Sequence, residues 1–173
     1  MIGKVFKLAL LAGAGVAAWK AATRNAPGSF FEQALHSGVA EVEAAKSAEL
    51  RGASAELRRF AQELEHDHNE FNQKLAEAGG LEVPQPDAGQ LAMLRQLDAH
   101  QGEEYDRAWL RHMARSHAKA IRLYQHTVDQ AGAGAQVASQ ALPRLRAHAR
   151  RVEELQQEGA PRVAGQAAPQ ASL

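Results

Sequence analysis

The chain of 173 residues contains no cysteine. Without cysteine there are no disulfides, thiolate nucleophiles, iron–sulfur clusters or cysteine zinc sites, so any metal site must use nitrogen and oxygen ligands. The chain also lacks an excess of either charge, because its 20 Lys and Arg residues balance its 20 Asp and Glu residues. Since proteins that bind nucleic acid carry a basic surface, this balance predicts no nucleic-acid partner.

Sequence motifs of the common enzyme classes are missing as well. The chain has no G-x-S-x-G segment, no phosphate-binding glycine loop and no dinucleotide fingerprint. Its most unusual chemical resource is a set of 8 histidines. These observations identify no reaction, and they favour a protein without enzymatic activity over an enzyme.

The first 18 residues have the pattern of a bacterial secretory signal peptide. Lys4 and Lys7 form a short basic region, residues 8–18 form an apolar run, and the small residues at 16–18 fit a cleavage site. The run is shorter than the about 20 apolar residues that a membrane-spanning helix needs. We therefore expect export to the periplasm or cell envelope. The alternative is an uncleaved anchor at residues 1–18 that would hold a peripheral protein at the membrane.

The rest of the chain has the apolar periodicity of helices. Residues 19–28 are expected to be a linker, and 159–173, rich in Ala, Gly, Pro and Gln, a disordered tail. Between them, 29–158 form one predicted domain without any alternating strand pattern. Its start is marked by Ser29 and Glu32, which fit a capping box. Helices are predicted from Ser29 to Gly52, over about 54–78, around 91–97, over about 103–130 and over about 135–157.

Four main amphipathic helices with one longer connection in the middle predict an all-α fold. The connection, residues 79–87, contains two Gly and two Pro residues, and the short helix that follows it precedes the third main helix. We therefore expect a four-helix bundle with one extra short helix.

Three histidines occupy positions where the helical period places core residues. His68, His117 and His148 each lie three or four residues from apolar residues on both sides. An unpaired polar ring in a core costs about 1–3 kcal/mol, so each imidazole needs a partner. Inward histidines from three helices converge if their levels in the bundle match.

The first helix has no inward histidine, but Glu41 or Glu49 is placed to supply a carboxylate. Three imidazoles and a carboxylate suit one transition-metal ion, for example Fe, Zn, Mn or Cu. The predicted metal site is therefore Glu41, His68, His117 and His148, and Asp67 or Glu65 could accept a hydrogen bond from a ligating ring. We favour a structural polar layer in which these groups bond to one another, and the metal site is the alternative. Imidazoles more than about 8 Å apart would exclude a single site.

The remaining polar candidates are expected to have ordinary roles. Asp106 lies three turns before His117, where it suits the first turn of a helix. The other histidines fall outside the predicted seams and are expected at the surface or at its edge: His36, His66, His100, His112 and His126.

Five short motifs then point to a family. They are an acidic segment at 39–43 that contains Glu41, the pair Asp67-His68, the pair Tyr105-Asp106, His117, and the Leu-Pro-x-Leu-x-x-His segment that ends at His148. In this order and spacing, residues 29–157 resemble the domain-of-unknown-function 4142 family of bacterial proteins, often labelled ferritin-like and outer-membrane.

The chain departs from the family pattern at several positions: Tyr105 stands where the family usually has Phe, and Glu65 where an apolar residue is usual. Trp109 stands where the family usually has Tyr, and Ser116 stands where an acid is usual. The resemblance implies a secreted, ferritin-like bundle with no established activity, and it marks Glu41 and the three inward histidines as the positions of interest. The sequence therefore favours an exported binding or stress-related protein, with a mononuclear metal protein and a membrane-tethered peripheral protein as alternatives.

Overall fold

The computed structural model describes residues 29–159. The predicted signal segment 1–18, the linker 19–28 and the tail from residue 160 onward lie outside the described residues. Within 29–159 every regular element is a helix, which confirms the all-α class. The helices are α2 (Phe30–Arg51), α3 (Ala55–Gly79), α4 (Ala88–Asp98), α5 (Gly102–Asp129) and α6 (Ala135–Glu158).

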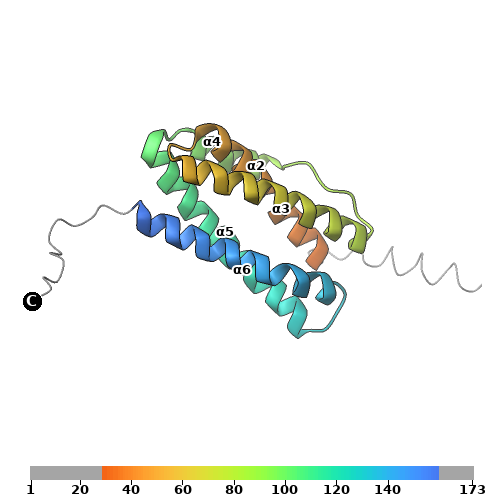
Figure 1. The fold of residues 1–173 in the computed structure, drawn as a ribbon. Coiled ribbons are helices and arrows are strands. Elements are labelled where there is room, and N and C mark those ends of the chain that lie inside the picture. Colours follow the sequence, from red (N-terminus) through yellow and green to blue (C-terminus); the bar gives the residue numbers. More distant parts are fainter. Residues whose placement is uncertain (1–28, 160–173) are drawn as a thin grey trace, which may run out of the picture.

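The four long helices form two hairpins that pack on each other (Figure 1). Helices α2 and α3 make the first hairpin, and α5 and α6 make the second. The segment 80–87 and α4 carry the chain back along the bundle, so α3 and α5 run in the same direction. The structure is the expected four-helix bundle, with α4 as the extra short helix before the third main helix.

Local chemistry explains where the helices begin and end. Ser29 accepts from the backbone N–H of Glu32 while Glu32 accepts from that of Ser29, which is the predicted capping box. Asp87 and Gln90 form the same arrangement at the start of α4. Helix α3 ends at Gly79 and is capped by Gly80, whose φ of 61° lies in the left-handed region that favours glycine. The predicted helix boundaries were therefore close to the observed ones.

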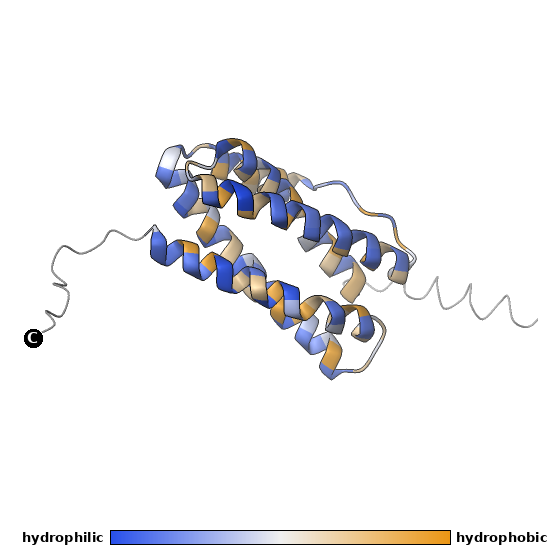
Figure 2. Cartoon of the chain, viewed as in Figure 1, coloured by the Kyte–Doolittle hydropathy of each residue, from blue (hydrophilic) through white to orange (hydrophobic). Residues whose placement is uncertain are grey.

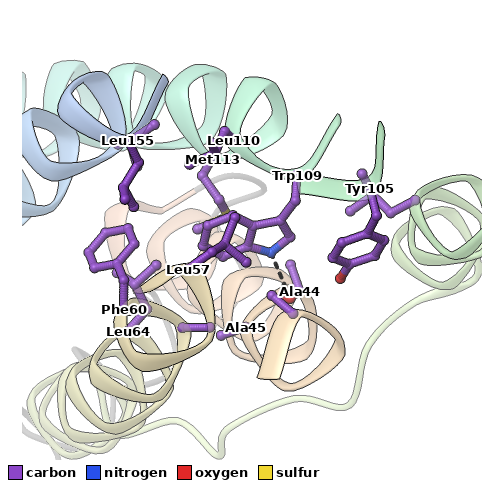
Figure 3. Packing of buried hydrophobic residues seen from close by; sticks show 14 of the residues in the cluster. Ala44, Ala45, Leu57, Phe60, Leu64, Tyr105, Trp109, Leu110, Met113 and Leu155 are labelled. Carbon is purple, nitrogen blue, oxygen red and sulfur yellow. Dashed lines mark hydrogen bonds between the residues drawn. The ribbon is translucent and has the colours of Figure 1, made fainter. Parts of the chain in front are cut away.

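The core consists mostly of buried apolar residues. Hydrophilic residues cover much of the ribbon of α3 that faces the viewer (Figure 2). Two apolar clusters fill the interior, one toward each end of the bundle. Trp109 is fully buried in the first of them, and its Nε1–H donates to the carbonyl oxygen of Ala44 at 2.8 Å (Figure 3). Tyr124 and Leu142 belong to the second cluster. None of the helices within 29–159 is long and apolar enough to cross a membrane.

Asp106 has a different role from the one that its own helix suggested. Its carboxylate accepts from the backbone N–H groups of Ala53 and Ser54, at 2.8 and 3.0 Å. Asp106 therefore stabilises the start of α3 from the neighbouring hairpin, and it contributes nothing to the layer that contains His117.

Candidate metal centre

A polar layer separates the two apolar clusters in the middle of the bundle. On each long helix the first and second clusters are divided by about two to three turns, and one buried ionisable side chain lies inside that gap. These side chains are Glu41 on α2, His68 on α3, His117 on α5 and His148 on α6. All four are buried, with exposed fractions of 0–6 %. The levels of the four residues therefore match.

The three imidazoles lie against one another. Their ring centroids are 5.5–5.6 Å apart, and one ring nitrogen from each lies within 4.8 Å of the other two. This separation is well inside the 8 Å limit for a single site. The structure thus brings together three of the four predicted ligands.

The hydrogen bond of His117 determines which of its nitrogens is free. Nδ1 lies 2.9 Å from the carbonyl oxygen of Met113, one turn earlier on α5, and a carbonyl can only accept. Nδ1 therefore carries the proton. In a neutral ring Nε2 then has a lone pair, and it is buried without a hydrogen-bond partner among the described residues. A ring oriented through one nitrogen with the other free is typical of a ligating histidine.

His148 is oriented in the same way by a carboxylate. Its Nε2 lies 2.8 Å from Oδ2 of Asp67, whose other oxygen accepts from Arg144 at 2.5 Å. Since a carboxylate accepts, Nε2 carries the proton. Nδ1 is buried and has no hydrogen-bond partner within 29–159. Asp67 is thus one of the two acceptors expected from the sequence, and Glu65 is not the partner of His148.

His68 and Glu41 meet at the α2–α3 interface. Nε2 of His68 lies 2.9 Å from Oε2 of Glu41, yet its direction does not satisfy a hydrogen bond to any acceptor in the described chain. The other carboxylate oxygen, Oε1, accepts from the hydroxyl of Ser116. The carboxylate is therefore next to His68, and it lies outside the set of three nitrogens that are mutually within 4.8 Å.

Burial and the neighbouring charges favour ligand-ready protonation states. Burial alone would raise the pKa of Glu41, but His68 and His117 hold this pKa well below the usual carboxyl range. Burial lowers the pKa of His117, and burial together with the nearby His68 lowers the pKa of His148 to about 4, although Asp67 acts in the opposite direction. At neutral pH, Glu41 is therefore ionised, and His117 and His148 are neutral.

The donor set fits one transition-metal ion. Three nitrogens at most 4.8 Å apart place an ion at their centre within roughly 2.8 Å of each. An inward shift of at most about 0.7 Å per ring gives the metal–nitrogen distance of about 2.0–2.1 Å. Soft rotations of three side chains supply such a shift, and Glu41 is close enough to His68 to act as a further ligand.

The remaining candidates from the sequence lie elsewhere. Glu49 is paired with Glu65, and burial and this second carboxyl raise the pKa of Glu49. His66 forms a more exposed group with Asp67 and Glu70. The two carboxylates of this group already form ion pairs, Asp67 with Arg144 and Glu70 with Lys74.

Sequence reasoning missed two residues beside the site. Ser116 was noted only for the acid that it replaces, whereas its hydroxyl holds Glu41. His112, expected at the surface or at its edge, is half-buried, and its Nε2 is buried without a partner among the described residues. Burial lowers the pKa of His112, opposed by the charge of Glu41.

The chain is thus a helical bundle whose four long helices each contribute one ionisable group to a buried cluster. A family model described as a domain of unknown function, DUF4142, matches residues 12–155. The chain belongs to this family. No curated protein and no solved structure matches it. The ferritin-like relationship that the resemblance implied stays a prediction.

Proposed function

We propose that this protein binds a single transition-metal ion through His68, His117 and His148, with Glu41 as an additional ligand. The observation that carries the proposal is a pair of buried nitrogens without hydrogen-bond partners in 29–159, Nε2 of His117 and Nδ1 of His148, beside the ring of His68, whose Nε2 contacts Glu41. The three rings come from three different helices and lie in one layer of the bundle. Imidazole and carboxylate ligands suit Fe, Zn, Mn or Cu.

A purely structural polar layer explains the same residues less well. Such a layer would satisfy each imidazole at both nitrogens, because an unpaired buried polar atom costs about 1–3 kcal/mol. His117 and His148 are instead satisfied at one nitrogen and unpaired at the other. Binding of an ion removes this cost at both rings, and for that reason we prefer the metal site.

The direct test is the stoichiometry and affinity of metal binding. The full chain is stripped with a chelator, supplied with Zn²⁺, and assayed by elemental analysis and by competition with a chromophoric chelator. We expect one ion per chain. His117→Gln should weaken binding by 100-fold or more, and Asp67→Asn by about 10–100-fold because it releases the ring of His148.

The matched control is His100→Gln, which removes an exposed histidine outside the layer. It should bind as tightly as the wild type. Circular dichroism of each variant establishes that the bundle is folded. Substoichiometric binding by the wild type, or equal affinity in His117→Gln and His100→Gln, would contradict the proposal.

We also propose that the protein acts in the bacterial envelope. The support is the signal-peptide pattern of residues 1–18. The test is the mass of the protein recovered from each cell fraction. A periplasmic form without these residues supports export, an intact form in the membrane fraction supports the anchored alternative, and an intact cytoplasmic form contradicts both.

A further inference from the structure

An open groove of about 780 Å³ lies between α2, α4 and α5. Ser116 and Ala40, the residue before Glu41, are among the residues that line it. Since Ser116 donates to Glu41, a single hydrogen bond separates the groove from the buried layer. The groove is therefore the side from which a solute in solvent can approach the metal site.

One stripe of α5 gives this groove its chemical character. His112, Arg115, Ser116 and Lys119 all line the groove. Their spacing of three, one and three residues places them on the same face of a helix. Two positive charges and a histidine thus surround the serine that contacts Glu41.

The acidic side chains of the groove already have partners, whereas two of its basic side chains have no ion-pair partner among the described residues. Asp87 is paired with His36 at 2.7 Å and also accepts from the backbone N–H of Gln90, and Glu32 is held in the capping box with Ser29. No carboxylate of the described chain lies within ion-pair distance of the two cations of the stripe, Arg115 and Lys119. The acids are therefore engaged while these cations are available to a ligand.

We propose that this groove admits a small anion to the metal ion, with Arg115 and Lys119 attracting it and His112 offering it a hydrogen bond beside Ser116. The inference rests on the proposed metal site. Three histidines and Glu41 occupy four positions, so a metal that accepts a fifth ligand keeps one position for an outside ligand. The ionised Glu41 repels an anion from the metal-free layer, and a divalent ion reverses this charge. Anion binding therefore depends on the metal.

The experiment uses the full chain loaded with Co²⁺, whose visible absorption reports the ligands of the ion. Sodium azide is added at constant ionic strength, because its small size and single charge suit the proposed ligand. We expect azide to change the Co²⁺ spectrum of the wild type. The double variant Arg115→Ala/Lys119→Ala should raise the Kd for azide about tenfold while it binds Co²⁺ as tightly as the wild type.

The matched control is Arg59→Ala/Arg150→Ala, which removes two exposed arginines that do not line the groove. It loses the same net charge and should bind azide like the wild type. Stoichiometric Co²⁺ with no spectral response to azide, or an equal response in both double variants, overturns the inference and leaves the metal site intact. A wild type that binds no Co²⁺ overturns the proposed function and this inference with it.

Discussion

Acidification should destabilise the metal-free protein through the histidines of the buried layer. His148 has a pKa of about 4 in the folded protein, compared with 6.5 in an unfolded chain. Between these two values the unfolded state binds more protons than the folded state, so the free energy of unfolding falls as the pH falls. His117 acts in the same direction, because burial lowers its pKa too.

The size of the effect follows from the shift. Each pKa unit corresponds to about 1.4 kcal/mol, so His148 alone removes about 2 kcal/mol between pH 6.5 and pH 5, and about 3 kcal/mol by pH 4. Glu41 also contributes to the pH dependence of stability, but it is an acid whose charged form is favoured in the folded protein. Its pKa is lowered, so its stabilisation is lost only as the pH falls below the ordinary carboxyl range near 4.5. The window from pH 6.5 to 5 therefore isolates the histidines.

The assay is urea unfolding of the chelator-treated protein at several pH values in this window. His148→Gln should lose stability with falling pH less steeply than the wild type, because one titrating ring is gone. His100→Gln, which changes an exposed ring, should keep the wild-type slope. Equal slopes in the wild type and His148→Gln would refute the reasoning, since His148 would then titrate alike in the folded and unfolded chains.

Two substitutions test the packing around the site. Gly38→Ala should destabilise the protein by about 1–3 kcal/mol in urea unfolding, because the new Cβ would lie 2.0 Å from Oδ1 of buried Asn72. Gly132→Ala, whose Cβ meets no described atom within 4 Å, serves as the control, and equal midpoints for the two variants would show that α2 and α3 have room to adjust. Trp109→Phe should cost about 2–4 kcal/mol, because it shrinks a buried ring and removes the hydrogen bond that Nε1–H donates to the carbonyl of Ala44. Its Zn²⁺ affinity should stay within a few-fold of the wild type, and a large loss would mean that the apolar cluster shapes the site directly.

Much of the fold could be predicted because its signals are local. The capping box at Ser29 and the cap at Asp87 involve residues only three positions apart, so the sequence contains both partners. His68, His117 and His148 could be singled out because each interrupts an apolar seam of its own helix. Whether the three rings lie at the same height along the bundle depends on the lengths of the loops and of the crossover, which the periodicity of a single helix does not contain.

The parts that could not be predicted depend on contacts between helices. A serine on an amphipathic helix is ordinary, and Ser116 becomes distinctive only because Glu41 of α2 faces it. The periodicity of α5 places His112 on a flank, and the packing of other elements buries its Nε2. Asp106 suited the first turn of its own helix, but the backbone N–H groups that it accepts from belong to the α2–α3 connection.

The division of the bundle into two hairpins has a consequence for its assembly. The α2–α3 hairpin carries Glu41 and His68, the α5–α6 hairpin carries His117 and His148, and the exposed segment 80–87 lies on the only path of the chain between them. A cut in this segment divides the four donors into two incomplete halves, each with an uncovered apolar face. Two chains that exchanged their hairpins across the crossover would rebuild two complete centres, each composed of donors from both chains.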